Sequence, residues 1–77
     1  MRIRFGVPSA QPVTLEICDL LGRRVATLLD HAWRPAGYHA LLWDGSARNG
    51  ALAPSGIYFS RLISSEGVIT RRILRLN

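Results

Sequence analysis

A chain of 77 residues with 48% hydrophobic and only 19% charged residues is expected to fold as one small domain, which excludes intrinsic disorder. No apolar run approaches the ~20 residues that cross a bilayer, and the opening residues lack the apolar segment of a signal peptide, so we expect the chain to be a piece of a larger precursor. The net charge of +5 comes from arginines spread along the chain, a distribution typical of solvated strand faces rather than of a nucleic-acid site.

The chain contains one cysteine, Cys18. A disulfide within the domain and a multi-cysteine metal site are therefore excluded. Cys18 lies in an alternating apolar and polar pattern, so we expect it to serve as a small, half-buried hydrophobic residue. Packing of side chains must then supply the stability of the domain.

Six segments show the period-two alternation and flanking turn residues that predict half-buried strands. In chain order they are residues 2–7, 13–18, 24–30, 38–43, 57–64 and 68–76. The intervening segments are rich in Gly, Pro, Asn and Asp, which favour turns and loops. They include residues 8–12, 19–23, 31–37, 44–50, 53–56 and 66–67. Because no helical period of apolar residues persists, the whole chain, residues 1–77, is predicted to be a single all-β domain.

The buried face of the third segment is left open by the sequence. Val25, Thr27 and Leu29 form one alternating set, whereas Ala26 and Leu28 form the other. Both sets contain apolar residues that suit a core, so either face of this strand can be the inner one.

The fourth segment ends at Trp43, whose ring offers about 200 Å² of apolar surface to a small core. Asp44 is expected to cap backbone N–H groups of the turn that follows, and Leu52 to pack the long loop onto the core. Tyr58 is expected to anchor the loop with its ring and to bond a backbone group through its hydroxyl. Positive φ or a close approach is expected at three glycines, Gly45, Gly50 and Gly56.

The last two segments form the strongest predicted hairpin. Arg71 and Arg72 are adjacent, so strict alternation would turn one of them inward. We therefore expect the last strand to lie at a sheet edge or to carry a bulge. Together the segments predict a small immunoglobulin-like antiparallel β-sandwich of six to seven strands.

Candidate catalytic and metal-binding residues are few. His31, in a predicted loop, and His39 are the only imidazoles, and neither belongs to a nucleophile and base arrangement. Asp44, Ser46 and Asn49 offer oxygens to Ca²⁺, but only one of them is a carboxylate and their spacing is not that of a calcium loop. We predict no catalytic site, no cofactor and no metal.

The most specific motif of the chain is Trp43-Asp44-Gly45, four residues, Gly50, five residues, Gly56-Ile57-Tyr58-Phe59, then Arg61-Leu62. It resembles the FlgD/Vpr-type Ig-like domain, found at the end of the flagellar hook-capping protein and at the C-terminus of large exported bacterial proteins. The type IX secretion sorting domain is a close relative of that family. The opening strands and the closing segment 70–74 agree with the resemblance, which covers essentially the whole chain.

The resemblance implies a non-catalytic C-terminal module of an exported protein that is secreted or held at the cell surface. Its role would be type IX sorting or cell-surface attachment, with secretion or attachment machinery as partner, no nucleic acid and no direct membrane insertion. The final hairpin would be the element that is recognised, through Arg61, Arg71, Arg72 and Arg75. A structural spacer or adhesion module and a hook-capping domain are the alternatives. The chain departs from the family by ending in Asn77 rather than a basic residue.

Overall fold

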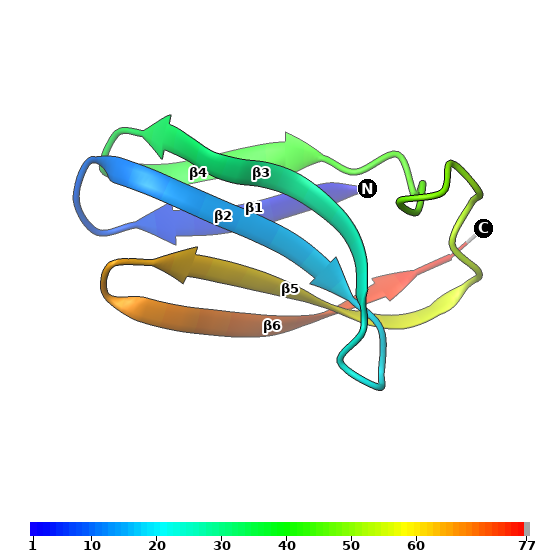
Figure 1. The fold of residues 1–77 in the computed structure, drawn as a ribbon. Coiled ribbons are helices and arrows are strands. Elements are labelled where there is room, and N and C mark those ends of the chain that lie inside the picture. Colours follow the sequence, from blue (N-terminus) through cyan, green and yellow to red (C-terminus); the bar gives the residue numbers. More distant parts are fainter. Residues whose placement is uncertain (77) are drawn as a thin grey trace.

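The computed structural model describes residues 1–76, which form two antiparallel sheets (Figure 1). The strands are β1 (Arg2–Val7), β2 (Gln11–Cys18), β3 (Arg24–Arg34), β4 (Gly37–Leu42), β5 (Gly56–Ser64) and β6 (Gly67–Arg75). β1 pairs with β4 in the smaller sheet, and the larger sheet has the order β3-β2-β5-β6. The predicted all-β sandwich is confirmed, with six strands. The predicted departure from the family at Asn77 lies outside the described residues.

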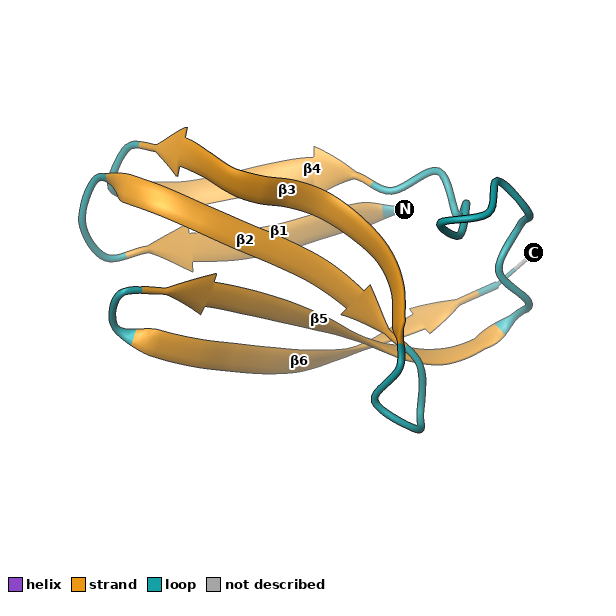
Figure 2. Ribbon diagram, viewed as in Figure 1, coloured by secondary structure: helices purple, strands orange, loops and turns teal. Residues whose placement is uncertain are grey.

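Only strands and loops are present in the described part of the chain (Figure 2). None of these residues belongs to a helix that could cross a membrane. The two sheets stack so that alternate side chains of each strand meet between them. The resulting core contains Ile3, Phe5, Val7, Val13, Leu15, Ile17, Ala26, Leu29, Trp43, Ala53, Tyr58 and Leu62. The alternation predicted for the first two segments is confirmed by this core.

β3 carries extra residues relative to its partner β2. The register between the two strands shifts at three places along their length. Each extra residue turns the following side chains to the opposite face, so a single alternating set cannot stay buried. The structure buries Ala26 and Leu29, one residue from each of the two sets that the sequence left open.

The predicted loop over residues 31–37 is wrong for most of its length. β3 continues to Arg34, and only two residues separate it from β4. His31 adopts a φ of 49° inside the strand, and its N–H donates to Thr14 Oγ1 at 3.2 Å. The loop was predicted from Pro35 and Gly37, but these turn-forming residues mark only the short connection between β3 and β4. His31 is exposed, as is Trp33 two residues later.

β6 is an edge strand, as predicted for a segment with adjacent arginines. Its nine pairs with β5, from Gly56 opposite Arg75 to Ser64 opposite Gly67, keep a constant register without a bulge. Residues 67–72 are exposed on both faces of the sheet. Arg71 and Arg72 therefore point to opposite faces, and neither is buried. The edge position, rather than a bulge, accommodates the pair.

Candidate recognition hairpin and tryptophan loop

Trp43 directly follows β4 and closes one end of the core. The residue is 1% exposed. It exchanges two backbone hydrogen bonds with Met1, at 2.8 and 2.9 Å, which extends the pairing of the smaller sheet by one step. The indole N–H donates to the carbonyl oxygen of Ser46 at 3.0 Å. The ring edge meets Tyr58, with centroids 5.6 Å apart and planes at 73°. The position of Trp43 is thus fixed by its backbone hydrogen bonds, by the hydrogen bond of its indole N–H and by the contact of its ring with Tyr58.

The turn after Trp43 is built on Asp44. Its Oδ1 accepts the backbone N–H of Ser46 at 2.8 Å and the Ser46 hydroxyl at 2.6 Å. These hydrogen bonds hold the pKa of the Asp44 carboxyl below its usual value. Further along the loop, Asn49 Oδ1 accepts the N–H of Ala51 at 3.0 Å. The oxygens weighed for calcium therefore bond groups of the loop itself.

Leu52 was predicted to pack the loop onto the core, and this prediction is wrong. Its side chain is 69% exposed, whereas the neighbouring Ala53 is 3% exposed. The N–H of Ala53 donates to the carbonyl oxygen of Gly45 at 2.7 Å. This bond places the small methyl group of Ala53 against the core and turns Leu52 toward solvent. In this loop the backbone hydrogen bond of Ala53, rather than the hydrophobicity of the side chains, therefore determines which residue is buried.

The end of the loop is anchored by Tyr58, the first buried residue of β5. Its ring is 7% exposed, and its hydroxyl donates to the carbonyl oxygen of Pro54 at 2.6 Å. The φ angles of the three motif glycines are positive: 83° at Gly45, 85° at Gly50 and 154° at Gly56. The six motif residues thus form one structural unit around the indole.

Arg75, at the end of β6, completes this unit. Its guanidinium carbon lies 5.6 Å from the centroid of the Trp43 ring, and its Nε donates to the carbonyl oxygen of Ala53 at 3.0 Å. Gly45 lies so close that a Cβ at this position would overlap the guanidinium group. Arg75 was predicted as a recognition residue, but its side chain is engaged inside the domain.

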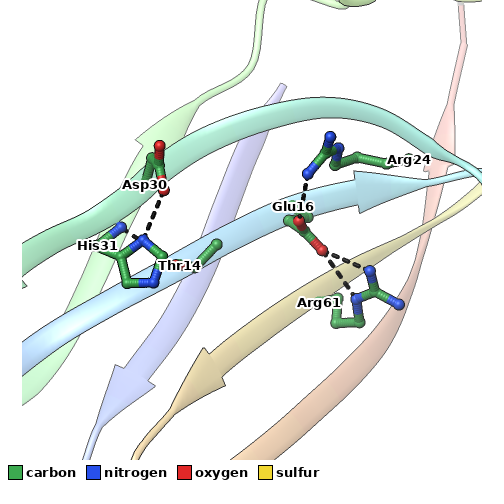
Figure 3. Close-up of polar contacts among 6 residues, drawn as sticks. All are labelled: Thr14, Glu16, Arg24, Asp30, His31 and Arg61. Atoms are coloured by element: carbon green, nitrogen blue, oxygen red, sulfur yellow. Dashed lines mark hydrogen bonds and ion pairs between the residues drawn. The ribbon is translucent and has the colours of Figure 1, made fainter.

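A second arginine of the predicted recognition hairpin, Arg61, is held by Glu16 on the outer face of the larger sheet (Figure 3). Its Nη2 and Nε donate to Glu16 Oε1 at 2.6 and 3.0 Å, and Arg24 Nη1 approaches Oε2 at 3.3 Å. The Glu16 side chain is only 7% exposed because the guanidinium groups cover it. Sequence analysis missed Glu16, although a lone carboxylate on a strand face of an arginine-rich chain is a signal for such a pair.

The hydrogen bond from Arg61 is the main cause that lowers the pKa of Glu16 from its ordinary value of 4.5, and burial opposes it. A lowered folded-state pKa adds stability above the unfolded-state pKa, and this stability is lost as pH falls through the folded-state value. We expect Glu16→Gln to reduce the free energy of unfolding by about 1 kcal/mol at pH 7, because both arginines are partly exposed.

The difference between the parent and Glu16→Gln should shrink steadily below a pH of about 4.5. Urea unfolding of the two proteins between pH 7 and pH 2 measures it. Other carboxylates of the domain also titrate in this range, but their contributions are common to both proteins and cancel. A difference that stays constant down to pH 2 would contradict the assigned role of Glu16.

Arg71 and Arg72 differ from the other two hairpin arginines. Within residues 1–76, no hydrogen bond or ion pair involves either side chain. They lie on opposite faces of β6, in the middle of the exposed edge. The predicted recognition set therefore divides into two structural arginines, Arg61 and Arg75, and two that face solvent.

Residues that carry acid–base or thiol chemistry do not gather at one place. His31 contacts Asp30 at 2.8 Å on the surface, and His39 stacks on Phe5 with centroids 5.3 Å apart. Cys18 is buried, and this burial raises the pKa of its thiol. Across residues 1–76, no three His, Cys, Asp or Glu side chains are placed to hold a metal ion.

The fold and the loop define a small antiparallel β-sandwich domain whose edge strand β6 is exposed and carries arginines. The sequence is 38% identical over 66 residues to the basal-body rod modification protein FlgD of Escherichia coli (strain K12). The similarity covers 82% of this chain and 28% of FlgD, so the chain spans less than a third of that relative. No family model and no solved structure matches the chain. The chain is thus a small β domain that is similar to part of FlgD, while its link to type IX sorting domains stays a prediction.

Proposed function

We propose that the chain is a non-catalytic module of a larger exported bacterial protein, recognised through its β5–β6 hairpin by a type IX sorting or cell-surface attachment apparatus. The observation that carries the proposal is the open edge of β6, which is exposed on both faces and bears two unpaired arginines. The similarity to part of FlgD supports a module within a larger chain. The location that follows is the cell surface or the medium.

An edge strand of this kind binds another strand through backbone hydrogen bonds. In an antiparallel pair every second residue turns its N–H and C=O away from the partner, so β6 presents a row of unpaired groups along its outer side. The constant register with β5 means that no bulge interrupts this row. Arg71 and Arg72 flank it on the two faces, and each favours an acidic side chain on an added strand. A partner strand of acidic character fits this edge.

The same surface argues for recognition rather than catalysis. The described histidines, the cysteine and the carboxylates are dispersed or bonded to groups of the domain itself. The two histidine rings contact the Asp30 carboxylate and the carbonyl oxygen of Pro35, not a hydroxyl or thiol that they could activate in acyl transfer. A purely structural spacer would use the same fold without the arginines of β6.

Export of a reporter tests the proposal. The chain is fused behind a signal peptide and a periplasmic reporter in a host with a type IX apparatus, and reporter activity is compared between periplasm and medium. We expect the parent fusion to leave the cell and Arg71→Ser/Arg72→Ser to reduce export by about tenfold, as for the loss of two exposed ion pairs. Arg34→Ser/Arg48→Ser removes the same charge elsewhere and should leave export unchanged.

Two outcomes would contradict this reading. Retention of the parent fusion in the periplasm, with the domain folded, would contradict the sorting role. It would favour the alternative that the domain is a structural spacer. Equal export of the parent and the β6 variant would show that these arginines are not recognised.

A flagellar assembly role is the second candidate, because the curated relative with 38% identity is a basal-body rod modification protein. Replacing the matching segment of the Escherichia coli protein by this chain tests it. Restored flagellar assembly, seen as swimming in soft agar, would favour this candidate over sorting.

A further inference from the structure

The sandwich is one strand short on one side. β1 packs across β5, so that the smaller sheet ends before it reaches β6. Leu62 and Tyr58 of β5 point into the core, and their partners on β6 are Ile69 and Ile73. These partners share the inner face, but Ile73 packs against the core whereas Ile69 is 53% exposed. Around Ile69, the inner face of β6 therefore has no strand opposite it in residues 1–76.

The free edge of β1 borders this uncovered face. Met1 and Trp43 exchange both of their backbone hydrogen bonds, and the pairing of β1 with β4 keeps a constant register from there. Bonded and non-bonded pairs alternate along an antiparallel ladder. It follows that Arg2, Arg4 and Gly6 turn their N–H and C=O groups away from β4. These peptide groups point to the side where the smaller sheet ends.

A hollow marks the same place. Its volume is about 360 Å³. It is lined by Gly6 and Val7 of β1 and the following Pro8, by Gly37 and Tyr38 of β4, and by Ile69 of β6. Neighbouring strands lie about 4.8 Å apart, so an extended chain beside β1 would fill this hollow and cover Ile69. The space is thus bordered by peptide groups on one side and by apolar side chains below.

The charge around the open position is positive. Arg2 and Arg4 flank the β1 edge on the outer face, and Arg71 lies on the inner face of β6. Within residues 1–76 none of these three side chains forms an ion pair. All five acidic residues of the chain are bonded elsewhere: Glu16, Asp19, Asp30, Asp44 and Glu66.

We infer that the open position beside β1 and above β6 binds an extended acidic strand of a partner protein, which adds to β1 as the third strand of the smaller sheet. Its apolar side chains alternate inward over Ile69, and its carboxylates alternate outward to Arg2 and Arg4. A second copy of this chain does not suit the position, because antiparallel pairing of two β1 strands would bring their outer-face arginines together. This site is separate from the outer edge of β6.

Titration of the 77-residue chain with a synthetic peptide tests the inference. The probe is an acetylated, amidated peptide of about eight alternating valines and glutamates. Heteronuclear NMR should show shifted and exchange-protected amides at Arg2, Arg4 and Gly6, with a dissociation constant in the micromolar range that rises with salt. The matched peptide of alternating valine and lysine should not bind.

Two variants separate the backbone contribution from the charge. Arg4→Pro removes an outward N–H that β4 does not use, so the sandwich should be retained while affinity for the Val–Glu peptide falls more than about tenfold. Arg4→Gln keeps the N–H and should weaken binding only about threefold. The parent protein with a Val–Glu peptide N-methylated at alternate residues provides the same test without a variant, and it should show no binding.

Three results would overturn the inference. The first is no binding of the Val–Glu peptide to the folded protein. The second is binding with amide shifts confined to the outer edge of β6, at Val68, Thr70 and Arg72. The third is self-association of the free chain through β1, detected by sedimentation. None of these depends on export of the reporter fusion, so the two proposals fail separately.

Discussion

Replacing Trp43 by alanine is expected to lower the free energy of unfolding by about 3–5 kcal/mol, the usual cost of removing a buried aromatic side chain. The indole is 1% exposed and contacts the loop, β5 and β6 at once. The loss is comparable to the whole stability of a domain of this size. Trp43→Ala should therefore melt far below the parent or show no cooperative transition by circular dichroism.

The other tryptophan provides a matched control. Trp33 is 62% exposed near the end of β3, and Trp33→Ala should cost less than about 1 kcal/mol. This variant also leaves Trp43 as the single indole, whose fluorescence should be blue-shifted and should shift to the red on unfolding. Cooperative melting of Trp43→Ala near the parent temperature would show that the core is assigned wrongly.

Gly45→Ala is expected to lower the free energy of unfolding by about 2–3 kcal/mol, through two separate effects. A φ of 83° strains any residue with a Cβ. The same Cβ would also displace the Arg75 guanidinium from the Trp43 ring and from the Ala53 carbonyl. Thermal and urea unfolding measure the sum of the two effects.

Gly22→Ala separates these effects. Gly22 has a φ of 79°, but a Cβ at this position meets no atom within 4 Å. Gly22→Ala should therefore lower the free energy of unfolding by only about 1 kcal/mol, because it introduces backbone strain without a steric overlap. In an Arg75→Ala background, the two glycine substitutions should become nearly equal. If Gly45→Ala and Gly22→Ala are already equal in the parent, the contact between Gly45 and Arg75 contributes nothing.

The strands of this domain could be predicted from the sequence because their signals are local. Alternation of apolar side chains is contained within each segment, as in residues 2–7. The irregular strand β3 shows the limit of this signal. The adjacent apolar pairs Val25-Ala26 and Leu28-Leu29 break a period of two, and only pairing with β2 shows where extra residues lie.

The roles of the arginines depend on contacts between distant strands, which no local pattern contains. Arg61 meets Glu16 across a pairing that joins residues 45 positions apart in the chain. Arg75 reaches a loop 22 residues upstream. Spacing in the sequence therefore identified the hairpin but did not separate its bonded arginines from the two that face solvent.

The contact between Arg75 and the tryptophan loop has a consequence during synthesis of the protein. Translation proceeds from the N-terminus, so Trp43 leaves the ribosome well before the residue that covers one face of its ring. Until Arg75 emerges, a nascent chain leaves that aromatic surface accessible to chaperones. A product truncated just before residue 75 would contain most of β6 and still lack this cover, so we expect its Trp43 ring to be more exposed than in the whole domain.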